Sequence, residues 1–182
     1  MTAAFPDSRF PAASVRPVLP GLLLAVLTLL FGFGLGVVFG LNEDAIKSRL
    51  TASAEAARVS VYQGDDAKIK VVLDKSWVYM QRAHLHAAGL GTTAVALTVV
   101  VVVLGVGPGL AAAISLALGG GGLGYSVFWL WAGFRAPALG GTGAAKETLS
   151  WLAIPSSGLF VAATFAVALL LVMALTSRRT SR

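Results

Sequence analysis

The stretch that decides the fold runs from His86 to Arg135 and reads HAAGLGTTAVALTVVVVVLGVGPGLAAAISLALGGGGLGYSVFWLWAGFR. No Lys, Arg, Asp or Glu lies between its two ends. About 20 residues of helix cross a membrane that is about 30 Å thick, so the stretch is too long for one span. Gly107-Pro108-Gly109 interrupts it, since proline cannot continue a helix and glycine favours a turn. The sequence therefore predicts a tight hairpin of two membrane helices, at about 85–105 and 110–134.

Two further apolar stretches, at about 18–41 and 152–175, bring the number of predicted spans to four. The first has no charged residue between Arg16 and Glu43, and no small-x-small cleavage site follows it. We therefore interpret it as a retained span and not as a signal peptide. Backbone polar groups find no partners in lipid, so each span is expected to be helical. The prediction is an all-α integral membrane four-helix bundle, with residues 1–182 forming a single membrane domain.

Composition supports a membrane environment. The chain has 182 residues, of which 57% are hydrophobic and only 12% charged, about half the usual globular share. The net charge of +6 is spread over tails and loops without a dense basic run. This distribution favours anionic lipid head groups as partners and argues against nucleic acid. The absence of cysteine excludes disulfides, thiolate metal sites and thiol nucleophiles.

The segment 42–84 is predicted to be an extended extramembrane helical hairpin between the first two spans. Gln63-Gly64-Asp65-Asp66 is a turn signal that contains a candidate Asp cap. Apolar residues repeat at helical spacing on both sides of it, at Ile46, Leu50, Ala54, Ala57 and Val61 and at Ile69, Val72, Leu73, Trp77 and Met80. These apolar faces either pack on each other or form a docking surface for another protein.

Four spans place both termini on one side of the membrane. The four tryptophans, Trp77, Trp129, Trp131 and Trp151, then lie at the opposite face, as in half of an aromatic interfacial belt. The segment 42–84 carries seven basic residues, which favours that loop as cytoplasmic. The C-terminal Ser-Arg-Arg-Thr-Ser-Arg has no acid near it, and on this ground we expect both termini to be cytoplasmic. The Gly- and Ala-rich composition is typical of a multi-pass protein of a bacterial inner membrane.

Glycines mark two candidate packing faces. Gly32, Gly36 and Gly40 lie four residues apart on the first span, a pattern that lets another helix approach closely. The third span contains Gly119, Gly120, Gly121, Gly122 and Gly124. Close packing inside the bundle is the favoured reading of both, although a kink, a ligand contact or homodimerisation also fits the pattern.

The candidate site is Arg82-Ala83-His84-Leu85-His86, which contains the only two histidines of the chain. At 100° per residue the two imidazoles point about 200° apart on one helix, so they are poorly placed to hold one metal ion or one haem. The first interpretation is an interfacial polar network, in which Glu43 or Asp44 pairs with Arg82 or His86. Such groups are common within a helical turn of the membrane boundary.

Two functional interpretations of the histidines remain open. His84 or His86 could be a single haem ligand or a hydrogen-bond donor to a quinone, with Trp77, Trp129 and Trp131 as a flat apolar surface. Alternatively, a histidine facing Asp44 could sense pH or accompany proton movement, since histidine ordinarily changes charge near neutral pH. A transporter is disfavoured because no ionisable residue lies in the middle of a span. No nucleophile, phosphate loop or acidic metal cluster points to catalysis, so the chain is not expected to be an enzyme and no metal site is expected.

Two resemblances bear on these residues. The His-x-His step resembles that of haem–copper oxidase catalytic subunits, but the other histidines of such a site are missing, and no ligand role is carried over. Asn42-Glu43-Asp44 and Arg82-Ala83-His84-Leu85-His86 make the chain similar to uncharacterised small four-span bacterial membrane proteins. That resemblance implies a fold and a membrane location but no activity.

The sequence thus predicts an accessory, assembly or scaffold subunit of a larger membrane complex. Small size, glycine packing faces and a helical hairpin favour this role. Its partners would be the lipid bilayer and another membrane protein or a second copy of the chain. The alternative is a haem- or quinone-binding component of membrane electron transfer that uses His84 or His86.

Overall fold

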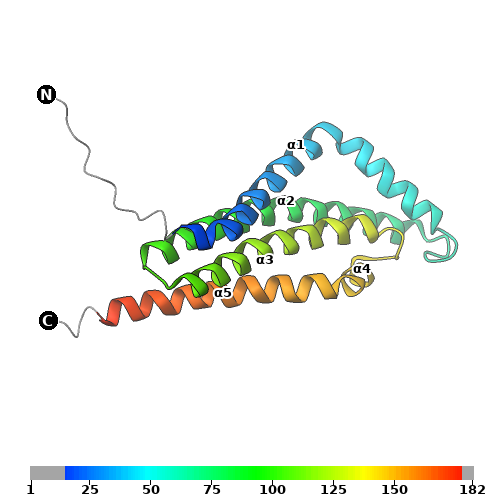
Figure 1. Cartoon of the computed structure of the whole chain (residues 1–182). Coiled ribbons are helices and arrows are strands. Elements are labelled where there is room, and N and C mark those ends of the chain that lie inside the picture. Colours follow the sequence, from blue (N-terminus) through cyan, green and yellow to red (C-terminus); the bar gives the residue numbers. More distant parts are fainter. Residues whose placement is uncertain (1–14, 178–182) are drawn as a thin grey trace, which may run out of the picture.

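The computed structural model describes residues 15–177, and over this range it consists of helices and connecting turns without any strand. The helices are η2 (Arg16–Val18), α1 (Leu19–Ala56), α2 (Asp66–Val103), α3 (Pro108–Arg135), α4 (Thr142–Thr148) and α5 (Ser150–Ser177), arranged as in Figure 1. The predicted all-α class is confirmed. Four of the helices (α1 together with η2, α2, α3 and α5) are long and apolar enough to cross a membrane. The chain therefore has the architecture of a multi-pass membrane protein.

The four long helices form an elongated bundle with α2 and α3 as its antiparallel central pair (Figure 1). The first half of α1 packs on both α2 and α3, and α5 packs mainly on α3. The start of α1, the end of α5 and the turn between α2 and α3 lie at the same end of the bundle. At that turn Gly105 adopts a φ of +66°, and Pro108 occupies the first turn of α3. Gly-Pro-Gly thus separates two helices, as the sequence analysis predicts.

The glycine run of α3 allows neighbouring helices to approach on two sides. A Cβ on Gly119 would overlap the carbonyl oxygen of Gly21 in α1. A Cβ on Gly121 would come within 2.7 Å of the backbone oxygen of Ser156 in α5. Close packing inside the bundle accounts for these glycines, since any side chain would separate α3 from one of its neighbours.

A kink at Asn42 divides α1 into two parts. Asn42 has φ −131° and ψ 24°, outside the helical region, and its side-chain amide donates to the carbonyl oxygen of Val38 at 3.2 Å. An asparagine side chain that bonds to the preceding turn competes with the helical backbone pattern. Figure 1 shows the consequence: α1 leaves the bundle up to the kink and then slopes back toward α2. The sequence alone does not predict this bend.

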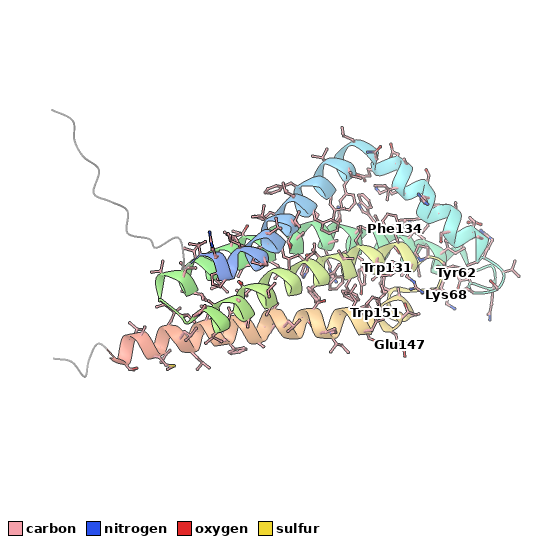
Figure 2. The ribbon with its side chains drawn as sticks, viewed as in Figure 1. Tyr62, Lys68, Trp131, Phe134, Glu147 and Trp151 are labelled. Atoms are coloured by element: carbon pink, nitrogen blue, oxygen red, sulfur yellow. The ribbon has the colours of Figure 1, made fainter. Side chains whose placement is uncertain are left out.

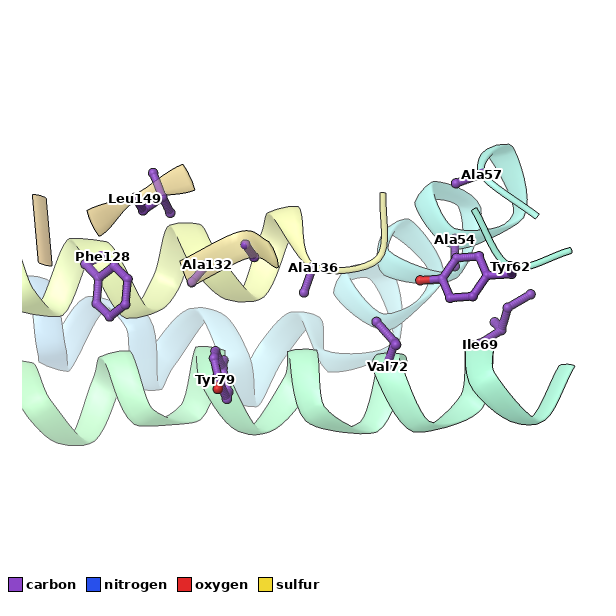
Figure 3. Packing of buried hydrophobic residues seen from close by; sticks show 11 residues of the cluster. Ala54, Ala57, Tyr62, Ile69, Val72, Tyr79, Phe128, Ala132, Ala136 and Leu149 are labelled. Carbon is purple, nitrogen blue, oxygen red and sulfur yellow. The ribbon is translucent and has the colours of Figure 1, made fainter. Parts of the chain in front are cut away.

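The hairpin packs on the end of α3 instead of standing alone. The turn 57–65 connects α1 to α2, and its Tyr62 is almost fully buried. The Tyr62 hydroxyl donates to the carbonyl oxygen of Pro137, beyond the end of α3, at 2.6 Å. Figure 2 labels Tyr62 near the turn of the hairpin. One apolar cluster joins both arms of the hairpin to α3 and to the α4 region (Figure 3), and it includes Ala54, Tyr62, Ile69, Val72, Phe128, Ala132, Ala136 and Leu149. The hairpin is therefore a fixed extension of the bundle.

The candidate Asp cap lies at the N-terminus of α2. The Asp65 carboxylate accepts a hydrogen bond from the backbone N–H of Lys68 at 3.0 Å. Replacing Asp65 by Ala is expected to lower the free energy of unfolding by about 1 kcal/mol, because one orphan N–H loses its partner. Denaturant titration in detergent would measure the loss. Asp74→Ala, an exposed position within the same helix, is the control and should change stability by less than half as much.

Candidate functional site

His84 lies on the side of α2 that faces α1. Its ring Nδ1 is 2.8 Å from the carbonyl oxygen of Gly32 in α1. A carbonyl oxygen only accepts hydrogen bonds, so Nδ1 carries the proton and donates. The remaining ring nitrogen, Nε2, is the one available to another partner, as an acceptor in the neutral ring.

Glycines on α1 make room for this imidazole. A Cβ on Gly36 would lie 2.9 Å from Cε1 of His84, too close for any side chain on the neighbouring helix. A Cβ on Gly32 would meet the backbone nitrogen of Ala88 at the same 2.9 Å. Gly40, the third member of the predicted packing face, has nothing within 4 Å of an added Cβ. Two of the three glycines therefore contact α2, whereas Gly40 borders open space.

Gly40 lines a groove between α1 and α2. The groove lies next to the bend of α1, which Figure 1 shows. We call it the α1–α2 groove. Its first cavity, of about 390 Å³, is lined by Gly36, Phe39, Gly40, Glu43, Trp77, Gln81, His84 and Leu85. An adjoining cavity of about 400 Å³ is lined by Lys47, Leu50, Thr51, Leu73, Asp74, Trp77 and Val78. Trp77 belongs to both linings, and each volume lies within the range of small-molecule sites.

His86 lies on the other side of α2, toward α3. Its Nδ1 donates to the carbonyl oxygen of Arg82, one turn earlier in α2, at 2.7 Å. The imidazole is stacked on Trp129, with ring centroids 5.4 Å apart and planes inclined by 27°. Tyr125 presents its edge to the same ring at 5.3 Å. The two histidines therefore occupy different helix interfaces and cannot share one ligand.

Among residues 15–177, Arg82 interacts with aromatic rings and forms no ion pair with a carboxylate. Its guanidinium carbon lies 5.3 Å from the ring centroid of Tyr79 and 5.1 Å from that of Trp129. A guanidinium over an aromatic face is stabilised by the ring quadrupole, more strongly when the pair is partly desolvated. Such contacts hold Arg82 against Trp129, the ring on which His86 stacks, on the side of α2 that faces α3.

The structure does not assemble the predicted ion-pair network. Glu43 pairs instead with Lys47, one turn along α1. Over residues 15–177, no ion pair joins Asp44 or Glu43 to Arg82 or to His86. The kink of α1 and the aromatic contacts of Arg82 explain the separation, because the acidic residues follow α1 while Arg82 faces α3.

Sequence reasoning named Trp129 but missed Tyr125 and Phe128, which pack with it on α3 next to His86. Tyr125 and Phe128 stack at 5.7 Å, and Phe128 contacts Trp129 edge-on at 5.3 Å. Their spacing of three and four residues would have placed them on one face of α3. Nε1 of Trp129 is buried and has no hydrogen-bond partner in the structure. This is a costly arrangement for an indole N–H.

The described residues can bind few kinds of ligand. Over residues 15–177, no group of three or more His, Asp, Glu or Cys side chains lies close enough to hold a metal ion. Because His84 and His86 lie at different helix interfaces, a haem bound at one of them would not also take the other as a ligand. The arrangement does allow a hydrogen bond from a small molecule in the α1–α2 groove to Nε2 of His84.

Comparisons with known proteins do not assign a family or a function to the chain. No family model, curated protein or solved structure matches the chain. The resemblance to small four-span bacterial proteins thus stays a prediction from two short motifs.

Proposed function

We propose that the chain is a non-enzymatic accessory, assembly or scaffold subunit of a larger membrane complex. The observation that carries the proposal is the hairpin, which is fixed to the bundle yet exposes apolar side chains outside the apolar spans. Val59 is 83% exposed, Val61 40% and Val71 51%. Lipid would cover exposed valines within a span, but these residues lie among the charged residues of the hairpin.

The rigidity of the hairpin strengthens this argument. Tyr62 anchors the turn to Pro137, and Arg58 bridges Glu55 and Asp66 across the turn. A surface that is already ordered loses less conformational entropy when a partner binds. The hairpin is therefore suited to present a fixed surface to another subunit.

The remaining parts of the proposal concern location and partners. We infer a bacterial inner membrane with both termini cytoplasmic, which places the hairpin on the opposite side. The bilayer covers the apolar outer faces of α1 and α5, whose exposed residues include Leu23, Leu30, Phe165 and Leu169. The protein partner is another membrane protein or a second copy of the chain. The basic residues are spread along the sequence without a dense run, which argues against nucleic acid as a partner.

Photo-cross-linking in native membranes tests the accessory role. A photoreactive amino acid at Val59 or Val71 is expected to capture the same protein partner from both positions. The same residue at Leu169, on the lipid-facing side of α5, should yield mainly lipid adducts. Deleting the gene should then lower the abundance of the captured complex. Lipid adducts alone at the hairpin positions would contradict the proposal.

A second candidate, a component of membrane electron transfer, is favoured by one observation. Both histidines donate Nδ1–H to a backbone carbonyl, which leaves Nε2 free, as in ligating histidines held by outer hydrogen bonds. An absorption spectrum and metal analysis of protein from its native membrane would test it. A Soret band that disappears in His84→Ala or His86→Ala would support this candidate. A colourless, metal-free preparation would contradict haem binding by this protein.

A further inference from the structure

We propose that the α1–α2 groove binds the uncharged ring of a membrane quinone, with Nε2 of His84 hydrogen-bonded to a ring oxygen. This binding site does not depend on the accessory role. It rests on the electron-transfer candidate and names the ligand that this candidate would use. The proposal rests on four features of the groove: the hydrogen-bonding group, the shape, the charge and the access from lipid.

His84 supplies a single oriented polar group. Its Nδ1 is held by the Gly32 carbonyl at 2.8 Å, so Nε2 is the ring nitrogen that remains for a ligand. His84 lines the groove and is half-buried. In the protonated ring Nε2 would donate to a quinone carbonyl, and in the neutral ring it would accept from a quinol hydroxyl.

The lining suits a flat ring. Gly36 and Gly40 bring the backbone of α1 to the cavity surface without side chains, and a Cβ on Gly40 would meet nothing within 4 Å. Trp77 and Phe39 lie against each other there, with ring centroids 5.3 Å apart and planes inclined by 59°. Aromatic surface next to bare backbone favours a planar apolar ligand with few polar atoms.

The charges around the groove favour an uncharged ligand over a phospholipid head group. Lys47 is the basic residue of the lining, and it is already paired with Glu43. Asp74, in the adjoining cavity, has no ion-pair partner among residues 15–177. The lining therefore offers a phosphate no free cation, whereas a neutral quinone needs none.

The position of the groove gives an isoprenoid tail a path to the bilayer. The groove opens where the apolar part of α1 ends, next to the kink at Asn42. Leu85 belongs to its lining and is 64% exposed on the outer surface of α2. Trp77 also lines the groove, and tryptophan is enriched at the membrane–water interface, so the groove is expected to lie at that depth. A ring in the groove could thus be reached from the membrane boundary.

The experiment uses the purified full-length protein in detergent and decylubiquinone or menaquinone-4 as the probe. Gly40→Leu fills the cavity without a backbone clash, and we expect it to weaken binding at least about tenfold. Gly34→Leu is the matched control, since Gly34 is exposed on the same helix, has nothing within 4 Å of an added Cβ and does not line the groove. It should bind as the unmodified protein does. His84→Leu should also bind about tenfold more weakly, and His86→Leu should not.

An azidoquinone identifies the site independently of affinity. Photolabelled peptides are expected from the parts of α1 and α2 that line the groove, around Gly40 and Gln81. Circular dichroism of each variant would establish that its helix content is unchanged. Equal binding by Gly40→Leu and Gly34→Leu, or labelling confined to the lipid-facing surface of α5, would overturn the proposal. Release of a phospholipid from the groove without quinone binding would also overturn it.

Discussion

Gly119→Ala is expected to lower the free energy of unfolding by about 2 kcal/mol, although alanine is the better helix former by about 1 kcal/mol. The added methyl group would overlap the backbone oxygen of Gly21 and approach Cβ of Leu24 to 2.9 Å. These atoms of α1 belong to the backbone or are bonded directly to it, so they cannot rotate away as the end of a flexible side chain can. α1 and α3 must therefore separate, which exposes packed surface along their contact. Thermal or denaturant unfolding in a fixed detergent would measure the loss.

Two other glycines provide the matched controls. Gly34 in α1 and Gly158 in α5 are helical, exposed and have nothing within 4 Å of an added Cβ. Alanine at either position should leave stability unchanged or raise it by up to about 1 kcal/mol through helix propensity. The tight contact between α1 and α3 would be contradicted if Gly119→Ala were as stable as Gly34→Ala.

Tyr62→Ala is the second substitution with a large expected effect. It should lower the free energy of unfolding by about 3–5 kcal/mol. Tyr62 is only 1% exposed and packs between the turn of the hairpin and the end of α3. Removing the ring leaves a cavity and deprives the Pro137 carbonyl of its donor at 2.6 Å. Tyr62→Phe keeps the ring and should lose only about 1–2 kcal/mol. The difference between the two variants measures the contribution of packing.

The Tyr62 contact also predicts a pH dependence. Burial raises the pKa of Tyr62 above its ordinary value. The neutral phenol is therefore favoured in the folded state, and its stabilisation is complete below the ordinary tyrosine pKa of about 10. Stability should decrease as the pH rises from that value toward the raised folded pKa. Tyr62→Phe should reduce this alkaline loss, whereas Val59→Ala, at a position 83% exposed, should retain it in full.

The sequence predicts the helices well because local signals define them. Proline at the start of α3 and aspartate before α2 determine where those helices begin, and long uncharged stretches identify four apolar helices. The kink of α1 could not be predicted in the same way. Asn42 lies at the end of an apolar run, where an asparagine is equally compatible with a straight helix that enters water. Only the packing of the second half of α1 on α2 selects the bent form.

The candidate site was predictable in part. The two-residue spacing indicates that His84 and His86 lie on different faces of α2, but not which helix each face contacts. The glycines of α1 place His84 against Gly32, and the aromatic face of α3 receives His86. Whether Arg82 pairs with Glu43 or Asp44 also depends on which helix its face of α2 contacts, and the sequence does not give that. Cation–π contacts with Tyr79 and Trp129 hold Arg82 away from the acidic residues of α1.

The size of the protein in its native membrane tests the accessory role most directly. A tagged chain, extracted in mild detergent, is expected to migrate on a native gel far above its own mass of 18.7 kDa together with its detergent. Val59→Asp combined with Val71→Asp, on the exposed hairpin surface, should shift it to the position of the purified chain alone. Native extracts in which the unmodified protein already migrates with the purified chain would contradict the account.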